Sequence, residues 1–156
     1  MILIKPMQHE HIDAVYEIEC DCFTTPWSKE SFERELATDM PPTFNIIALL
    51  YEPFQEPKVV GYAGMWHIVN EGHITNVAVH GRHRRKGIAA MLLCRLVDIA
   101  KQHEMIGLTL EVRVSNHAAQ ALYEQFGFVS EGLRKGYYAD TGEDAIVMWK
   151  HLPHPH

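Results

Sequence analysis

Alternating apolar and polar positions predict β-strands along much of this chain. The clearest case is the segment 108–114, where leucine and valine occupy one face and Thr109, Glu111 and Arg113 occupy the other. More continuous apolar runs, bounded by glycine and proline, predict six further strands: 2–4, 44–51, 59–69, 73–80, and two between 128 and 150 that meet near 140–142. A turn at 71–72 is expected to join the third and fourth strands.

Apolar residues at helical spacing predict four helices, over 8–20, 28–37, 88–103 and 116–126. In the first helix, the residues that share one stripe are Ile12, Val15, Tyr16 and Glu19. Ser28 and Asn116 stand where their side-chain oxygens can cap free N–H groups at helix starts. Prolines at 41–42 are expected to end the second helix, and Gly127 follows the last one as its C′ residue.

Composition and length predict one α/β domain with a mixed sheet over residues 1–150, followed by a frayed tail over 151–156. The hydrophobic content is 47% and the charged content 22%, which is typical of soluble globular proteins. No apolar run is long enough to span a bilayer, so no membrane partner is expected. The net charge of −6 argues against a general nucleic-acid binder.

The cysteines favour a cytoplasmic protein without a disulfide framework, because there are three of them, an odd number. Cys20 and Cys22 lie near two histidines in the sequence, but this C-x-C spacing lacks the second half of a zinc site. We therefore expect no metal.

A basic turn lies between the strand at 73–80 and the helix at 88–103. Residues 82–86 hold four of the 14 lysines and arginines of the chain, and Gly87 precedes the helix. Free N–H groups and the macrodipole at a helix start attract anions, and nearby basic side chains reinforce both. Neither the P-loop string nor the dinucleotide string is present, so a phosphorylated ligand of another kind is predicted.

Two residues have both a structural and a catalytic interpretation. Glu111 can form an ion pair with Arg113 at a wet strand end, or it can be a partly desolvated base with a pKa raised towards neutrality. Taken alone, the residues favour the ion pair. Tyr123 is either a core residue with a hydrogen-bonded hydroxyl or a proton donor in a cleft. Aromatic residues in loops or at strand ends either close the core or line a peptide groove: Trp27, Tyr137 and Tyr138.

The segment from Arg84 to Ala89 resembles the Arg/Gln-x-x-Gly-x-Gly/Ala pyrophosphate loop of the GNAT N-acetyltransferases. The resemblance covers nearly the whole chain. Within the GNAT family, the chain resembles the RimI group, the ribosomal-protein-alanine N-acetyltransferases. It extends through these ordered segments: 26–28, 73–79, 110–116, 121–128, 134–138 and 143–148. The chain has Ala89 where many members have glycine, and His80-Gly81 where the group often has an acidic residue and proline.

The resemblance implies a mostly antiparallel mixed sheet of about seven strands flanked by about four helices. It implies acetyl-CoA as co-substrate and no metal. It makes Glu111 the general base and Tyr123 the general acid, which reverses the preference for an ion pair, and it puts Trp27, Tyr137 and Tyr138 at the acceptor. The residues that it implies for acetyl-CoA binding are Val77, Ala78, Val79, Arg84, Arg85, Lys86, Gly87, Ile88, Ala89, Ala90 and Asn116.

The acceptor amine can be predicted from its pKa. An α-amino group titrates near 7.7–8.0 and a lysine near 10.4, so deprotonating a lysine at neutral pH costs about 3.5 kcal/mol more. We therefore expect the acceptor to be the N-terminal tail of a protein, with alanine as its first residue and a small-subunit ribosomal protein as its source. The alternatives are a broader peptide N-terminal, lysine or small-amine acetyltransferase, and a non-catalytic acyl-CoA-binding module. Such a module would need neither Glu111 nor Tyr123.

Overall fold

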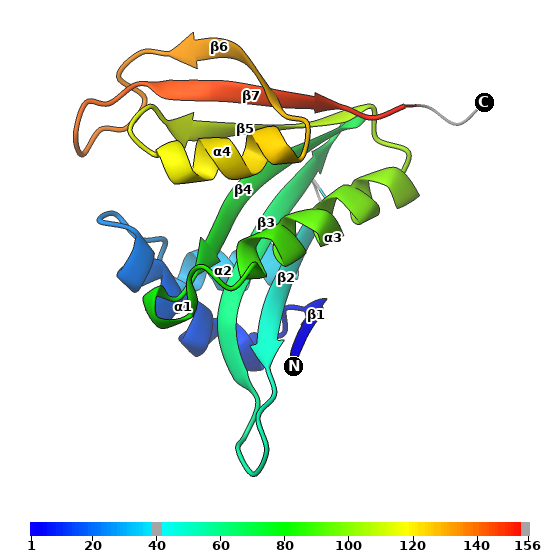
Figure 1. Ribbon diagram of the computed structural model, residues 1–156, viewed down its shortest axis with the longest axis vertical. Coiled ribbons are helices and arrows are strands. Elements are labelled where there is room, and N and C mark those ends of the chain that lie inside the picture. Colours follow the sequence, from blue (N-terminus) through cyan, green and yellow to red (C-terminus); the bar gives the residue numbers. More distant parts are fainter. Residues whose placement is uncertain (39–41, 154–156) are drawn as a thin grey trace.

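The computed structural model describes residues 1–38 and 42–153, and within them a seven-stranded sheet runs through the protein (Figure 1). In sheet order the strands are β1 (Ile2–Pro6), β2 (Thr43–Leu50), β3 (Lys58–Ile68), β4 (Glu71–Val79), β5 (Gly107–Arg113), β7 (Ala145–His151) and β6 (Val129–Arg134). Neighbouring strands are antiparallel except for β4 and β5. The predicted mixed, mostly antiparallel sheet is confirmed.

Four α-helices accompany the sheet in the described residues: α1 (Ile12–Cys22), α2 (Lys29–Ala37), α3 (Ile88–Gln102) and α4 (His117–Gln125). Short 3-10 turns precede α1 and α3, at His9–His11 and Gly81–His83. Helices α1 and α2 pack against β2, β3 and β4, while α3 crosses β1 to β5. In Figure 1, α3 and α4 lie in front of the sheet. None of the described helices is long and apolar enough to cross a membrane.

The helix boundaries follow the capping residues that the sequence indicates. The Ser28 side chain accepts a hydrogen bond from the Ser31 N–H at 3.1 Å, and Asn116 Oδ1 accepts one from the Ala119 N–H at 3.1 Å. Gly127 follows α4 with φ of 90°. Helix α2 ends at Ala37, and its expected proline stop falls largely on residues 39–41, outside the described residues.

Two hydrophobic cores lie on opposite faces of the sheet. The larger core fills the face under α3 and α4, where Leu92, Leu93 and Leu96 are fully buried. The smaller core joins α1 and α2 to the other face through residues such as Phe32 and Tyr62. The chain stays anchored beyond residue 150, because β7 continues to His151 and the following leucine is buried in the larger core.

The expected turn at 71–72 is wrong, because the hairpin between β3 and β4 turns at Val69 and Asn70. Glu71 already pairs with Ile68, and Val69 takes the positive φ of 57° that the tight turn requires. Gly72 is needed for close packing instead. A Cβ on it would lie 2.8 Å from a methionine sulfur of β3 and 3.0 Å from another that follows α3.

The sheet opens between β4 and β5. These strands pair only over Glu71–His73 and Gly107–Thr109, and beyond those residues they diverge (Figure 1). In the diverging half of β4, Thr75 has no partner on β3, so the register shifts at this bulge. Bulges often occur beside active sites, where they re-aim side chains. The opening and the bulge together make this region the candidate site.

Candidate active site

The basic turn presents backbone donors in front of α3. Arg85 and Gly87 both have left-handed backbone angles, with φ of 64° and 75°. Across the described chain, no group accepts a hydrogen bond from the backbone N–H groups of residues 85–90. A Cβ on Gly87 would meet nothing within 4 Å, so the space before these donors is open. A concave set of N–H groups at a helix start fits a pyrophosphate.

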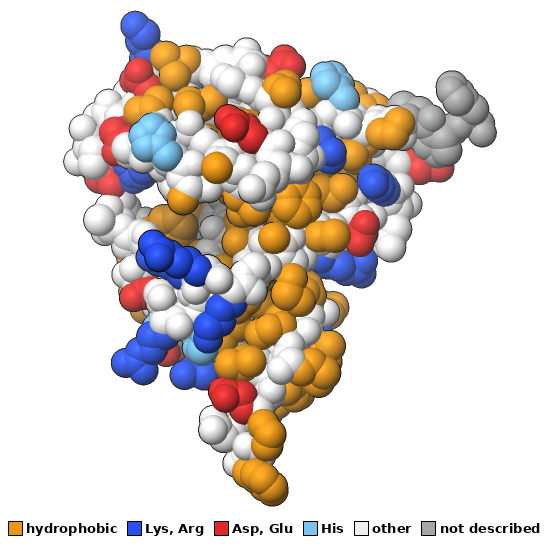
Figure 2. All heavy atoms as spheres, in the orientation of Figure 1, with side chains coloured by type: hydrophobic (Ala, Val, Ile, Leu, Met, Phe, Trp, Pro, Cys, Tyr) orange, Lys and Arg blue, Asp and Glu red, His pale blue; other side chains and the backbone are white. Residues whose placement is uncertain are grey.

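The basic side chains of the turn have different partners. Figure 2 shows Lys and Arg side chains gathered around the start of α3. Arg84, however, donates through Nε to the Val79 carbonyl at 3.3 Å, and its terminal nitrogen lies 3.3 Å from Cys22 Sγ and 3.9 Å from Asp21 Oδ2. It therefore ties the turn to β4 and α1. A direct contact between Arg84 and the cofactor stays a prediction.

A cavity of about 270 Å³ lies where β4 and β5 diverge. It brings together six of the candidate catalytic, cofactor-binding and acceptor-binding residues: Trp27, Val77, Glu111, Asn116, Tyr123 and Tyr138. Tyr137 does not line it; that residue is half exposed and packs edge-on against Tyr138, with ring centroids 5.1 Å apart. Ala78 and Val79 have buried side chains, so only their backbone groups can serve a ligand.

Glu111 has a different ion-pair partner from the one expected. Its Oε1 lies 3.3 Å from Arg134 Nε on β6, whereas Arg113 binds Asp140. The Arg113 prediction is wrong because the loop joining β6 and β7 folds back onto the end of β5 and brings its own carboxylates. The Glu111 carboxylate lines the cavity and is partly exposed. Its role as a base stays a prediction.

Tyr123 is the buried residue of α4, with 8% of its surface exposed. Among the described residues, no group forms a hydrogen bond with its hydroxyl, and the residue lines the cavity; its role as a proton donor stays a prediction. Burial, and to a lesser degree Tyr138, raise the pKa of Tyr123 to about 12. The hydroxyl therefore stays protonated at neutral pH and can donate into the cavity.

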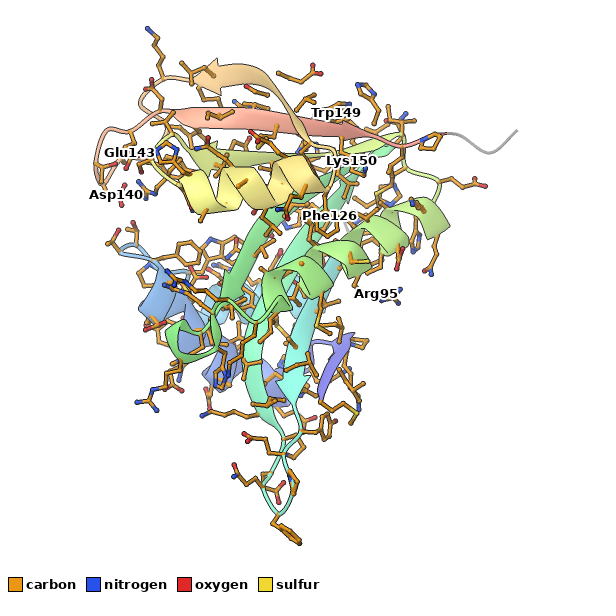
Figure 3. The ribbon with its side chains drawn as sticks, viewed as in Figure 1. Arg95, Phe126, Asp140, Glu143, Trp149 and Lys150 are labelled. Atoms are coloured by element: carbon orange, nitrogen blue, oxygen red, sulfur yellow. The ribbon has the colours of Figure 1, made fainter. Side chains whose placement is uncertain are left out.

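The two loops beside the cavity are joined by side chains. Arg113 donates to both Asp140 oxygens, at 3.0 and 2.8 Å, and its guanidinium lies 4.0 Å from the centroid of the Tyr138 ring. Thr24, between α1 and α2, donates to Asp140 Oδ2 at 2.7 Å. In Figure 3, Asp140 and Glu143 lie at the end of the β6–β7 loop that faces this segment. The hydrogen bonds from Arg113 and then Thr24 lower the pKa of Asp140 to about 2.

The sequence analysis missed Glu19, a buried carboxylate of the cavity with 2% of its surface exposed. It accepts hydrogen bonds from the Trp27 N–H at 2.9 Å, from Asn76 Nδ2 at 3.0 Å and from the Tyr62 hydroxyl. A signal was present, since an acidic residue on the apolar stripe of a helix is rarely buried without a reason. Its partners could not be found from the sequence, because they come from three other segments.

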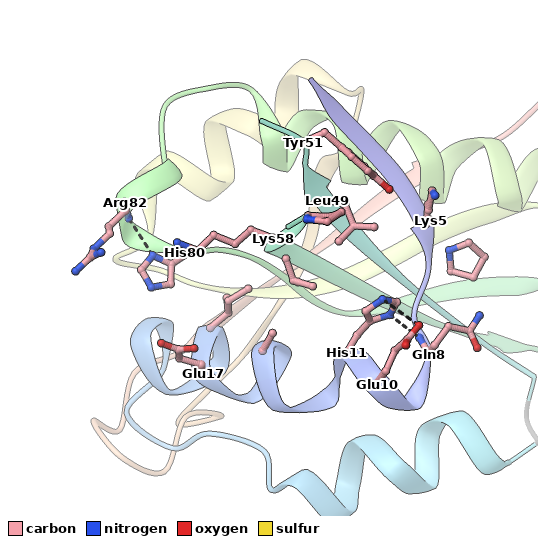
Figure 4. A pocket seen from close by; sticks show the side chains of 15 residues that line it. Lys5, Gln8, Glu10, His11, Glu17, Leu49, Tyr51, Lys58, His80 and Arg82 are labelled. Atoms are coloured by element: carbon pink, nitrogen blue, oxygen red, sulfur yellow. Dashed lines mark hydrogen bonds and ion pairs between the residues drawn. The ribbon is translucent and has the colours of Figure 1, made fainter. Parts of the chain in front are cut away.

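A second, larger cavity of about 800 Å³ lies between α1 and the strand ends of β1 to β3 (Figure 4). Its charges are mixed, with Lys5, Lys58 and Arg82 facing Glu10 and Glu17. It contains none of the candidate catalytic residues, although His11, the N-cap of α1, lines it. In the described part of the chain, no cluster of three or more His, Cys, Asp or Glu residues could hold a metal ion.

The fold and the site define an acetyltransferase. Residues 12–128 match the Acetyltransferase (GNAT) family. The chain belongs to this family and is an acetyl-CoA-dependent N-acetyltransferase, as its resemblance to the family predicted.

Individual relatives are similar over almost their whole length. A Bacillus subtilis (strain 168) protein, whose name proposes it as a ribosomal protein bS18-alanine N-acetyltransferase, is 40% identical over 146 residues, which cover 94% of this chain and 93% of that protein. The ribosomal protein bS18-alanine N-acetyltransferase of Escherichia coli (strain K12) is 33% identical over 150 residues, covering 95% and 96%.

Solved structures share the fold. The crystal structure of the ribosomal-protein-S18-alanine N-acetyltransferase from Escherichia coli has a TM-score of 0.86 at 30% identity, covering all of this chain and 97% of that one. A chain of the NatC complex bound to Gag peptide and CoA has a TM-score of 0.84 at 24% identity, which is a likeness of fold alone.

Proposed function

We propose that this protein acetylates the N-terminal α-amine of a ribosomal protein whose first residue is alanine. The observation that carries the proposal is the similarity, over more than nine tenths of both chains, to two relatives named for this reaction on bS18. The site is compatible with it, because one cavity gathers Glu111, Asn116 and Tyr123 beside Trp27 and Tyr138 at the diverging part of β4. A ribosomal acceptor would put the reaction in the cytoplasm.

Acetyl-CoA would bind along the basic turn and the open edge of β4, and it would supply the acetyl thioester. The backbone donors of residues 85–90 would hold its pyrophosphate. The free edge of β4 from Val77 to Val79 would hold the pantetheine arm, and a backbone N–H near Val77 would stabilise negative charge on the carbonyl oxygen. Asn116 lines the same cavity near the start of α4 and would contact the arm close to the sulfur.

Glu111 would take the proton that the α-ammonium must lose before its nitrogen attacks. The carboxylate lines the cavity opposite β4, on a rigid strand that pairs with β7 along its length. At pH 7 roughly a tenth of α-amines are already neutral, so the base needs to supply only about 1 kcal/mol of deprotonation. Holding both substrates in one cavity would supply much of the remaining acceleration.

Tyr123 would stabilise the departing sulfur. Burial raises its pKa to about 12, above the value of about 8.5 for an ordinary thiol, so its hydroxyl holds its proton more firmly than a thiol does. We therefore infer that Tyr123 acts mainly by donating a hydrogen bond to the sulfur. This sharpens its predicted role as the general acid.

The test is mass spectrometry of peptides incubated with acetyl-CoA and the enzyme. An Ala-first peptide that copies a small-subunit ribosomal N-terminus should gain one acetyl group on its α-amine. The same peptide with a blocked N-terminus and free lysines should stay unlabelled. Equal labelling of the blocked peptide would contradict the proposal and indicate a lysine acetyltransferase. Acetylation of polyamines with neither peptide labelled would indicate a small-amine enzyme.

A further inference from the structure

Glu19 is a buried acid that lacks a cation. Across the described residues, no Lys, Arg or His nitrogen lies within 4.0 Å of its carboxylate, although it is 98% removed from solvent. Its hydrogen-bond donors are all neutral: a backbone N–H, an amide and a phenol. Buried carboxylates are normally paired with a positive charge, because desolvating an unpaired charge is costly. A cation is therefore missing from its surroundings.

The acceptor sites of the carboxylate are not all filled. A carboxylate can accept about four hydrogen bonds. Oε1 accepts from Tyr62 and Asn76, whereas Oε2 accepts only from the Trp27 N–H. Burial and the Glu19 charge raise the pKa of Tyr62 well above its usual value, so this phenol remains a donor. The remaining capacity is on Oε2, in a side chain that lines the reaction cavity.

The surroundings of Glu19 make it part of the acceptor side. Trp27 and Asn76 line the same cavity as Glu111 and Tyr123, and both donate to Glu19. Because the basic turn with its free N–H groups belongs to the cofactor side, a cation that reaches Glu19 must come with the acceptor. A peptide N-terminus brings such a cation as its α-ammonium group.

Resting on the proposed function, we propose that Glu19 binds the charged α-ammonium group of the acceptor before Glu111 removes its proton. The site would thus select acceptors that arrive as cationic amines. A role limited to holding the Trp27 N–H and the Asn76 amide would not need a full negative charge, since neutral acceptors satisfy such donors. The cation also supplies the charge partner that the buried acid lacks.

The experiment compares two peptides in Glu19→Gln and wild type, with coenzyme A present so that no turnover occurs. One is the Ala-first peptide, and the other carries hydrogen in place of its α-amine. A charge-assisted hydrogen bond predicts that wild type prefers the amine peptide by about tenfold to a hundredfold in Kd. Glu19→Gln should lose this preference while its affinity for the desamino peptide is unchanged. Glu17→Gln, an exposed acid on the same helix, should keep it.

Two outcomes would overturn the inference: equal losses of affinity for both peptides, which would make Glu19 only a support for the loop, and no loss for either. If Glu19→Gln does not fold, the inference can be tested with Glu111→Gln instead, by measuring its preference for the amine peptide over the desamino peptide as a function of pH. In that variant Glu19 is the remaining acid that lines the cavity close to the acceptor. The preference for the amine peptide should fall above pH about 8 as the α-ammonium loses its proton, and a constant preference would refute the inference. Wild-type turnover of the Ala-first peptide, measured separately, tests the proposed function itself.

Discussion

The proposed cofactor side and the proposed acceptor side of the candidate site are built from different parts of the chain. On the proposed cofactor side the candidate binding groups are backbone N–H groups of one continuous segment, residues 85–90, at the start of α3. On the proposed acceptor side they are side chains from separate elements, held together by Glu19 at one end and by the Arg113–Asp140 pair at the other. A backbone site tolerates changes of side chain so long as its shape is kept. A side-chain site depends on each of its members.

The largest expected effect would come from breaking the backbone site at Gly87. A Gly87→Glu variant puts a side chain and a negative charge into the open space before the free N–H groups, so acetyl-CoA affinity should fall by at least roughly a hundredfold. Calorimetry of the folded protein measures this. Gly142→Glu is the matched control, because Gly142 has φ of 74°, close to the 75° of Gly87, and equally open space. Unchanged affinity in Gly87→Glu would show that the turn does not bind the pyrophosphate.

The next largest effects concern proton handling, where side chains should matter for rate and not for cofactor binding. Glu111→Gln should lower kcat roughly a hundredfold to ten-thousandfold, and Tyr123→Phe roughly a hundredfold, each with nearly unchanged acetyl-CoA affinity. Steady-state kinetics on the Ala-first peptide measure both. Tyr51→Phe, far from the cavity, is the control. Near wild-type turnover in Glu111→Gln would leave Glu111 as the ion-pair partner of Arg134 alone.

The smallest expected effect concerns the bridge between the acceptor loops. Asp140→Asn removes the charge that Arg113 and Thr24 contact, so KM for the peptide should rise roughly twofold to fivefold while acetyl-CoA affinity stays the same. Asp98→Asn, exposed on α3, is the control. A larger effect on acetyl-CoA than on peptide would show that the two sides are not separate.

The Asp140 carboxylate also predicts how the stability of the protein depends on pH. The folded-state pKa of Asp140 is lowered from 3.8 to about 2, so its stabilising contribution is complete above pH 3.8 and is lost as the pH falls through 2. The difference in Tm between wild type and Asp140→Asn should therefore shrink over that range. A difference that does not change with pH would exclude the ion pair as its cause.

The contrast between the two sides also explains what could be predicted from the sequence. The basic turn before α3 and the caps at Ser28 and Asn116 depend on residues close together in the chain, and their positions agree with expectation. The turn was wrongly predicted at residues 71–72 because a glycine can be needed for close packing as well as for a turn, and Gly72 is needed for packing. The partners of Glu19 and Glu111 lie on other elements, so only the fold brings them together.

The unpaired Thr75 gives β4 two phases within one strand. Before it, even-numbered residues such as Ile74 face α3; after it, odd-numbered residues such as Val77 do. Asn76 consequently points towards α1, where it reaches Glu19. If β4 kept Thr75 but paired it in a regular ladder with β3, every side chain from Asn76 to the end of the strand would change faces. The acid would lose its amide donor although no residue of the cluster had been substituted.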